Sequence, residues 1–166
     1  MDALTVLKRC RAAAADIERL QIRISQRREV LDGIGAPQAD PNGGSRPGGD
    51  VDRMGRVFGD LDELEREREA RKEMEKAERV AAVTLLDMVP DLEGLVLYDY
   101  YVRRQDTGTI ARERKYTAGY VRKTKRNGEQ LLGMISEERV NATLPAWYLR
   151  EEARRAGDRH GHRADP

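Results

Sequence analysis

Hydrophobic residues recur every three or four positions from Ala3 to about Leu31, the spacing that places them along one face of an α-helix. The same spacing returns between residues 51 and 90 and, in shorter runs, between residues 91 and 156. Ile17, Ile24 and Leu31 are seven residues apart, a repeat that holds one seam of a helix against a partner helix. We therefore expect an all-α protein that begins with a long, coiled-coil-like helical hairpin.

A stretch rich in glycine and proline separates the two long helices of this hairpin. Residues 35–50 offer little burial to offset the entropy lost on ordering, so they predict a flexible linker between helices over residues 1–34 and 51–90. Asp50 is placed to cap the second helix. The seam of the first helix fits two partners equally: the second helix of the same chain, or a second copy. A homodimer through the N-terminal helices is one of these two open interpretations.

The middle of the second helix is almost entirely charged. Between Glu65 and Glu73 the apolar stripe thins to Ala70, and charges of like and unlike sign stand four residues apart. This part is expected to be a solvated helix face, or to pack through the aliphatic stems of its Arg and Lys side chains.

The C-terminal third, residues 91–136, has the spacing of a helix-turn-helix. The pattern predicts a helix from Asp91 to about Arg104, a short helix with Thr107 or Thr109 as N-cap, and a third helix capped by Thr117. In this motif a small and an apolar residue of the short helix pack against an apolar residue of the third helix. Ala111, Ile110 and Val121 stand at those places. The third helix is expected to carry Tyr120, Val121, Thr124, Leu131 and Leu132.

Three residues of this module are unusual for the motif. Lys115 stands in the turn where glycine is common, so this position either avoids a left-handed conformation or bears its cost. Gly119 and Gly128 are each expected to weaken the third helix by about 1 kcal/mol relative to alanine.

Charge is distributed unevenly along the chain. The net charge is only +1, but between Thr107 and Arg126 seven bases accompany one acid, Glu113. The third helix begins with short side chains and carries long basic side chains further along. This arrangement suits contacts with base edges and phosphates in the major groove. We expect Arg122 to influence sequence preference and Lys125 to contact phosphates. The residues expected to bind DNA are Arg112, Lys115, Thr117, Ala118, Tyr120, Arg122, Lys123, Lys125 and Arg126.

The run IARERKYTAGYVRKTKRNGEQLL, from Ile110 to Leu132, resembles region 4 of bacterial sigma-70-type factors. Ile110-Ala111, Glu113, Thr117, Val121-Arg122 and Leu132 match the small, acidic, capping, apolar and basic positions of that region. The wider layout resembles the phage-encoded ArpU/RinA-type transcriptional regulators. The resemblance implies a phage or prophage regulator of transcription that binds double-stranded DNA sequence-specifically with the helix after Thr117.

Two other functions stay open. A phage DNA-packaging subunit, of the small-terminase kind, also combines a helix-turn-helix with oligomerising helices and would form a ring. Sigma region 4 contacts RNA polymerase as well as DNA, so the module would alternatively serve a helical adaptor that binds the polymerase.

An enzyme is not expected. The two histidines, His160 and His162, lie in a tail rich in Gly, Arg and Asp, so no packed acid–base pair contains a histidine. No phosphate-binding loop motif is present, and we expect neither a cofactor nor a metal site. Cys10 has the position of a small buried hydrophobe. No apolar run is long enough to span a bilayer, so we expect a cytoplasmic protein without a membrane partner.

The chain is predicted to finish with a helical segment over residues 137–156 and a disordered tail over residues 157–166. Leu144, Trp147, Tyr148 and Leu149 form the last apolar group before the tail. This group fits either packing against the three-helix module or docking of a partner protein.

Overall fold

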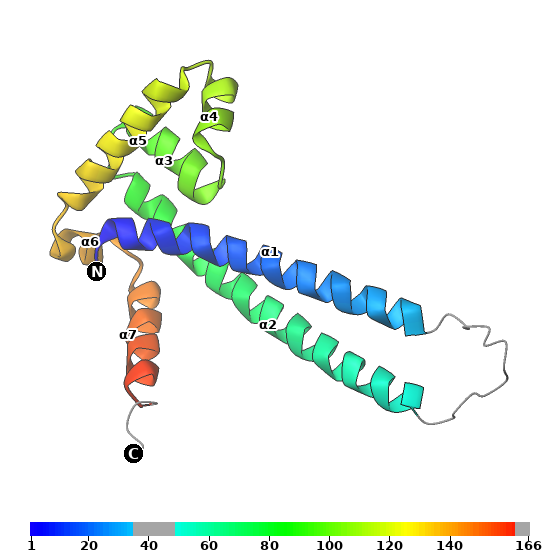
Figure 1. The fold of residues 1–166 in the computed structure, drawn as a ribbon. Helices are drawn as coiled ribbons and strands as arrows, with labels where there is room; N and C mark the ends of the chain where they lie inside the picture. The colour runs from blue at the N-terminus through cyan, green and yellow to red at the C-terminus, as the bar shows by residue number, and fades with distance from the viewer. Residues whose placement is uncertain (35–48, 162–166) are drawn as a thin grey trace. The chain divides into compact units, whose positions relative to one another are not determined.

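The computed structural model describes residues 1–34 and 49–161 of the chain (Figure 1). Within those ranges every regular element is helical, which confirms the all-α fold class. None of the described helices combines the length and the apolar content that a bilayer crossing requires. The predicted linker falls almost entirely outside the described residues. The elements are α1 (Ala3–Ile34), α2 (Gly49–Leu86), α3 (Asp91–Leu97), a π-helical turn η1 (Tyr98–Val102), α4 (Thr107–Arg114), α5 (Ala118–Gly133), α6 (Glu137–Thr143) and α7 (Ala146–Gly161).

The chain forms two compact units. The first comprises residues 13–74, which are the second part of α1 and the first part of α2. The second comprises residues 1–12 together with the chain from Glu75 onward, and it contains α3 to α7.

The unit of residues 13–74 is a pair of antiparallel helical segments around one apolar strip. Leu20 and Ile24 of α1 pack with Val57, Leu61 and Leu64 of α2, and Leu31 lies beside them. The seam predicted on the first helix therefore has α2 of the same chain as its partner. This packing leaves a homodimer through that seam without support.

The charged residues in the middle of α2 contact α1 as well as solvent. Arg68 is half-buried and donates a hydrogen bond of 2.9 Å to Oε1 of Gln21. Arg28 donates to Oε1 of Glu65 over 2.6 Å. These side chains lie along the helix pair with their charged heads at its surface, as the aliphatic stems of Arg allow.

The core of the other unit joins the start of α1, the end of α2, and α6 and α7. Its buried residues include Leu7, Leu85, Leu97, Leu132 and Val140. Burial raises the pKa of the Cys10 thiol to about 11. Cys10 is thus an inert core residue, as its position in the pattern predicts.

The last apolar group of the chain divides between core and surface. Tyr148 is fully buried and donates to a carboxylate oxygen of the buried Glu78 over 2.7 Å, whereas Trp147 is exposed. Arg155 donates to the other oxygen of Glu78 over 3.2 Å. These contacts hold α7 against α2. The helix continues to Gly161, beyond the predicted end at residue 156, and the side chains of His160 and His162 lie outside the described part of the structure.

Candidate nucleic-acid interface

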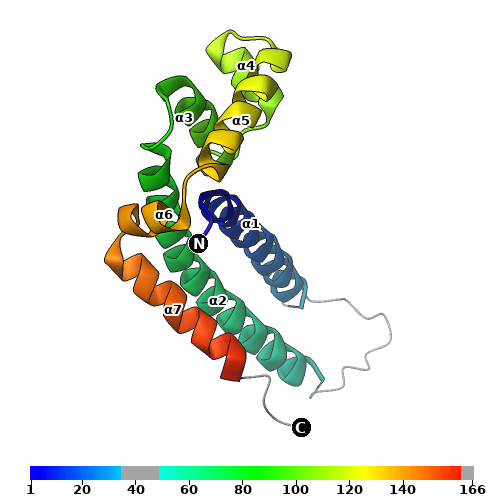
Figure 2. The ribbon, with the colours of Figure 1, turned by 90° about the vertical axis from the view of Figure 1, so that its left-hand side faces the viewer.

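A small apolar cluster fixes the angle between α4 and α5. Ile110 and Ala111 of α4 pack with Val121 of α5 and Val96 of α3, and all four side chains are buried. These are the three positions that the sequence assigns to this role, with Val96 as a further member. Figures 1 and 2 show α4 and α5 joined by a short turn beside α3.

The N-terminus of α4 is capped by Asp106, not by Thr107 or Thr109 as expected. One carboxylate oxygen of Asp106 accepts from the backbone N–H of Gly108 (2.8 Å) and of Thr109 (3.0 Å). The other accepts from the Thr109 hydroxyl (2.7 Å). These hydrogen bonds, chiefly that from Thr109, hold the pKa of Asp106 below its ordinary value. Thr109 thus serves as a donor to the cap, because a carboxylate one residue before the helix accepts from both free N–H groups.

The turn between α4 and α5 places Lys115 in the left-handed conformation, at φ 58°. The N–H of Tyr116 bonds the carbonyl of Ala111 (2.9 Å), and the N–H of Lys115 approaches that of Arg112 (3.4 Å). These two hydrogen bonds are typical of a helix C-terminus that is followed by a residue in the left-handed conformation. Of the two alternatives for Lys115, the residue bears the conformational cost.

Thr117 caps α5, as predicted. Its hydroxyl accepts from the backbone N–H of Tyr120 over 3.2 Å, and its carbonyl accepts from the N–H of Val121 over 3.1 Å. Extended backbone at Thr117 lets the chain change direction directly into α5.

The segment before α4 is not the single helix predicted to end near Arg104. The α-helix ends at Leu97, and η1 follows as a wider π-helical turn in which the N–H of Arg103 bonds the carbonyl of Tyr98. The last carbonyls before the end of a helix have no partner within it. The guanidinium of Arg11, on α1, donates to the carbonyl of Tyr100 and lies over the Tyr100 ring.

A buried carboxylate in η1 holds α4 in place. Asp99 is almost completely buried and accepts from Nε of Arg114, the last residue of α4. Arg103 donates to the other oxygen of Asp99 over 3.2 Å. Glu113 accepts from Nε2 of Gln105 over 2.7 Å. The polar side of α4 is therefore bound to the segment that precedes it.

The close approach of α5 to α3 depends on Gly128. This glycine is buried, and a Cβ atom there would lie 2.7 Å from Cδ1 of Leu97 and 3.2 Å from Cβ of Glu93. A Cβ at Gly119 would meet nothing within 4 Å. The burial of α5 follows the line of Val121, Thr124, Gly128 and Leu132, while Tyr120 and Leu131 are exposed.

The opposite face of α5 is the polar surface predicted from the sequence. Arg122, Lys123 and Arg126 are exposed there, and none of them forms an ion pair or hydrogen bond with another described residue. Asn127 and Gln130 lie exposed on the same face. These two amides were not among the predicted site residues, although their spacing from Arg126 and Lys123 would have placed them there.

Lys125 does not belong to this face. Its side chain is only 20% exposed; Nζ lies 2.7 Å from a carboxylate oxygen of Glu129 and 4.2 Å from the centre of the Tyr100 ring. The same oxygen of Glu129 accepts from the Tyr101 hydroxyl. The sequence placed Lys125 with the outward-facing bases because it neighbours them along the chain. Tyr100 and Glu129 draw it inward.

The remaining predicted residues surround the start of α5. Ala118 is half-buried against the apolar cluster, and Thr117 is occupied as the cap. Lys115 and Arg112 are exposed, with Arg112 donating to the Thr109 hydroxyl over 3.3 Å. The exposed rings of Tyr120 and Tyr116 stack at a tilt, with centroids 5.1 Å apart. Tyr116 is a further member of this surface that the sequence did not single out.

The result is a surface on which basic side chains outnumber acidic ones. Glu113 and Glu129 are the two acidic residues between Thr107 and Gly133; Glu113 accepts from Gln105, and Glu129 accepts from Tyr101 of η1. The described bases at the outward surface of α4, the turn and α5 therefore have no carboxylate of their own segment to neutralise them. Among the described residues, no group of three His, Cys, Asp or Glu side chains is arranged to hold a metal ion.

No protein-family model matches this chain, and neither the curated proteins nor the solved structures contain a match.

Proposed function

We propose that this protein binds double-stranded DNA by placing α5 in the major groove, in the manner of a helix-turn-helix. The observation that carries the proposal is the outward face of α5, where Arg122, Lys123 and Arg126 are exposed and have no partner among the described residues. An isolated basic helix face is most often only solvated. Here the basic face belongs to a helix that is capped by Thr117 and that follows a turn with Lys115 in the left-handed conformation. A buried apolar cluster fixes the angle between this helix and α4.

The side-chain types on this face suit the two tasks of DNA recognition. Arginine pairs with guanine, and Asn or Gln pairs with adenine, through two hydrogen bonds at the major-groove edge. Arg122, Arg126, Asn127 and Gln130 supply those groups. Lys115 in the turn and Arg112 on α4 are exposed, and their positive charges suit contacts with the phosphates beside the groove.

The role in transcription rests on the resemblance of Ile110–Leu132 to sigma region 4. We propose a sequence-specific regulator because the face of α5 carries base-reading side chains as well as phosphate-binding ones. A protein that only neutralised phosphates would have no use for the exposed amides of Asn127 and Gln130.

Selection of bound duplexes from random DNA, with the purified full chain, tests sequence-specific binding. The proposal predicts an enriched motif that changes when Arg126 or Asn127 is replaced by alanine. Each loss of a base contact is expected to cost about 1–3 kcal/mol at the selected site.

Arg150→Ala provides the matched control for this selection. Arg150 is an exposed base of the same unit, on α7, and its loss should leave the motif and the affinity unchanged. Absence of any enriched motif, with the chain folded, would contradict sequence-specific binding and favour a protein-binding role for this module.

A further inference from the structure

The last turns of α2 carry apolar side chains on their outer face, away from the core. Val80 and Val83 are exposed, although Ala81, Ala82, Leu85 and Leu86 between and beyond them are buried. Two exposed valines one turn apart form an apolar strip that nothing in the described part of the chain covers.

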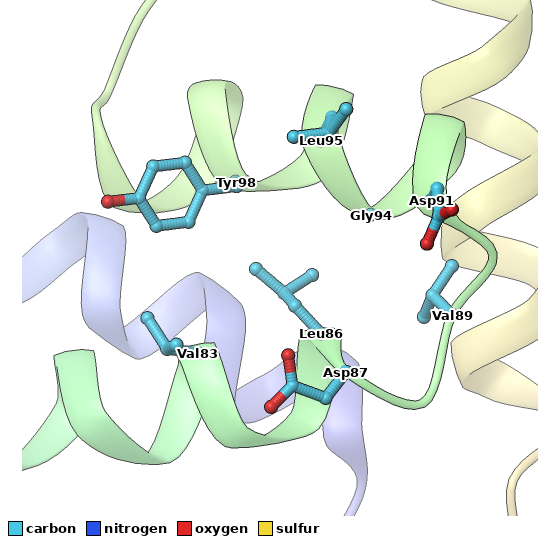
Figure 3. A pocket seen from close by; sticks show the side chains of 8 residues that line it. All are labelled: Val83, Leu86, Asp87, Val89, Asp91, Gly94, Leu95 and Tyr98. Carbon is cyan, nitrogen blue, oxygen red and sulfur yellow. The ribbon is translucent and has the colours of Figure 1, made fainter.

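This strip lies beside a groove. A hollow of about 460 Å³ opens between the end of α2 and α3, and Val83, Leu86, Leu95 and Tyr98 supply most of its apolar lining. Figure 3 shows Leu86 pointing into this space, with Asp87 and Asp91 close to it. Leu95 is also exposed, so the apolar surface extends from α2 onto α3.

The charged residues around the strip have a definite order. Lys76, Val80 and Val83 follow one another at steps of four and three, which places them in one line along α2. Asp87 follows four residues later, in the turn directly after the end of the helix. All four are exposed. A base therefore stands at the N-terminal end of the line and an acid at its C-terminal end.

A line with this order complements itself when it is reversed. If a second copy of α2 lies antiparallel, Val80 of each copy meets Val83 of the other, and Lys76 of each copy meets Asp87 of the other. The four-three-four spacing is that of residues at the seam of paired helices. Because the pairing is symmetric, each attractive contact occurs twice.

We propose that the protein forms a homodimer in which the Lys76–Asp87 faces of two α2 helices pack antiparallel, with the groove beside α3 receiving part of the second copy. The apolar contact supplies affinity, and the two charge pairs fix the antiparallel register. This surface is distinct from the seam of the first helix, where Leu20, Ile24 and Leu31 pack against α2 of the same chain. The dimer does not rest on DNA binding.

Complementary charge reversals test this register directly. Lys76→Glu makes both symmetric contacts acidic, and Asp87→Lys makes both basic. Sedimentation velocity of the full chain, without DNA, should show a dimer for the wild type and a self-association weakened by about tenfold or more for each variant alone. Mixing the two variants in equal amounts should restore the dimer, because each contact then joins an acid to a base.

The apolar part of the surface has a closely matched control. Val83 and Val30 are both 37% exposed on a helix, but Val30 lies on α1 in the other unit. Val83→Asp should dissociate the dimer, and Val30→Asp should leave it intact, with circular dichroism showing that both variants are folded.

A wild-type chain that sediments as a monomer at its highest soluble concentration would overturn the proposed dimer. So would a mixture of the Lys76→Glu and Asp87→Lys variants that stays monomeric while the wild type dimerises. Neither result bears on the α5 surface, since a monomer can still bind DNA and a dimer can still fail to do so.

Discussion

Gly128 is the residue on which the contact between α5 and α3 depends. A methyl group there would lie 2.7 Å from a terminal carbon of Leu97, which is itself fully buried and cannot turn away into solvent. Gly128→Ala should therefore destabilise the fold by about 1–3 kcal/mol, as overpacking of a core does. Chemical denaturation followed by circular dichroism measures this change.

Gly119→Ala is the control for that substitution, because a Cβ at Gly119 meets nothing within 4 Å. Alanine there should raise the free energy of unfolding by up to about 1 kcal/mol through its higher helix propensity. Equal effects at the two glycines would show that α5 does not approach α3 as closely as described.

Lys115 combines a structural cost with a proposed functional gain. At φ 58° a lysine is strained, whereas glycine is not. Lys115→Gly should stabilise the fold by about 1 kcal/mol and, at the same time, weaken binding to all DNA sequences alike, because one phosphate-contacting charge is lost. Lys115→Ala is the informative comparison. It should weaken DNA binding similarly without the gain in stability.

At the scale of single residues, the sequence predicts conformations that depend on near neighbours and misses those that depend on distant ones. The cap at Thr117 and the burial of Ile110, Ala111 and Val121 follow from spacing within one segment. The inward turn of Lys125 depends on Tyr100, which lies on η1. Gly119 and Gly128 look alike in the sequence, because only the packed structure brings Leu97 against one of them.

At the scale of elements, a partly buried polar contact joins Glu129 of α5 to Tyr101 of η1. Burial opposes ionisation of Glu129, but hydrogen bonds from Lys125 and Tyr101 outweigh it and lower the pKa of this carboxyl below 4.5. A lowered pKa in the folded state means that the contact stabilises the fold above about pH 4.5, and that this stability is lost as the pH falls toward the folded-state pKa.

Thermal unfolding across this acidic range checks the role of Glu129. Glu129→Gln should lower the melting temperature near neutral pH and should flatten its decline on acidification. Glu138→Gln changes an exposed carboxylate on α6 and should leave the decline as in the wild type. A wild-type decline that persists in Glu129→Gln would assign the acid sensitivity to other groups.

The element boundaries show where sequence reasoning stops. The start of α5 could be predicted because Thr117 caps it locally, but the π-helical turn η1 could not. Its free carbonyl at Tyr100 is satisfied by Arg11, 89 residues earlier in the chain. The cap of α4 was misassigned because Thr107 and Thr109 suit the position as residue types, while Asp106 accepts two backbone hydrogen bonds.

At the scale of the whole molecule, the all-α class follows from composition and hydrophobic spacing alone. The division into two compact units does not, because α1 and α2 each continue from one unit into the other without a break in their helical pattern. From the sequence, the seam of α1 could pack against the second helix of the same chain or against a second copy. In the structure it packs against Val57, Leu61 and Leu64 of α2. Most residues of the proposed DNA surface were predicted from the sequence. The structure removes Lys125 from that set and adds Asn127, Gln130 and Tyr116.

The outward face of α5 is proposed to bind DNA, and the salt dependence of binding tests this proposal most directly. Titration of a fluorescent duplex with the full chain at several salt concentrations should give an affinity that falls steeply with salt, because each neutralised phosphate releases a counterion. Arg126→Ala should reduce the slope of log affinity against log salt by up to about 0.9, and Arg150→Ala should not change it. An affinity that does not change with salt concentration would contradict this proposal. So would equal changes in affinity for Arg126→Ala and Arg150→Ala.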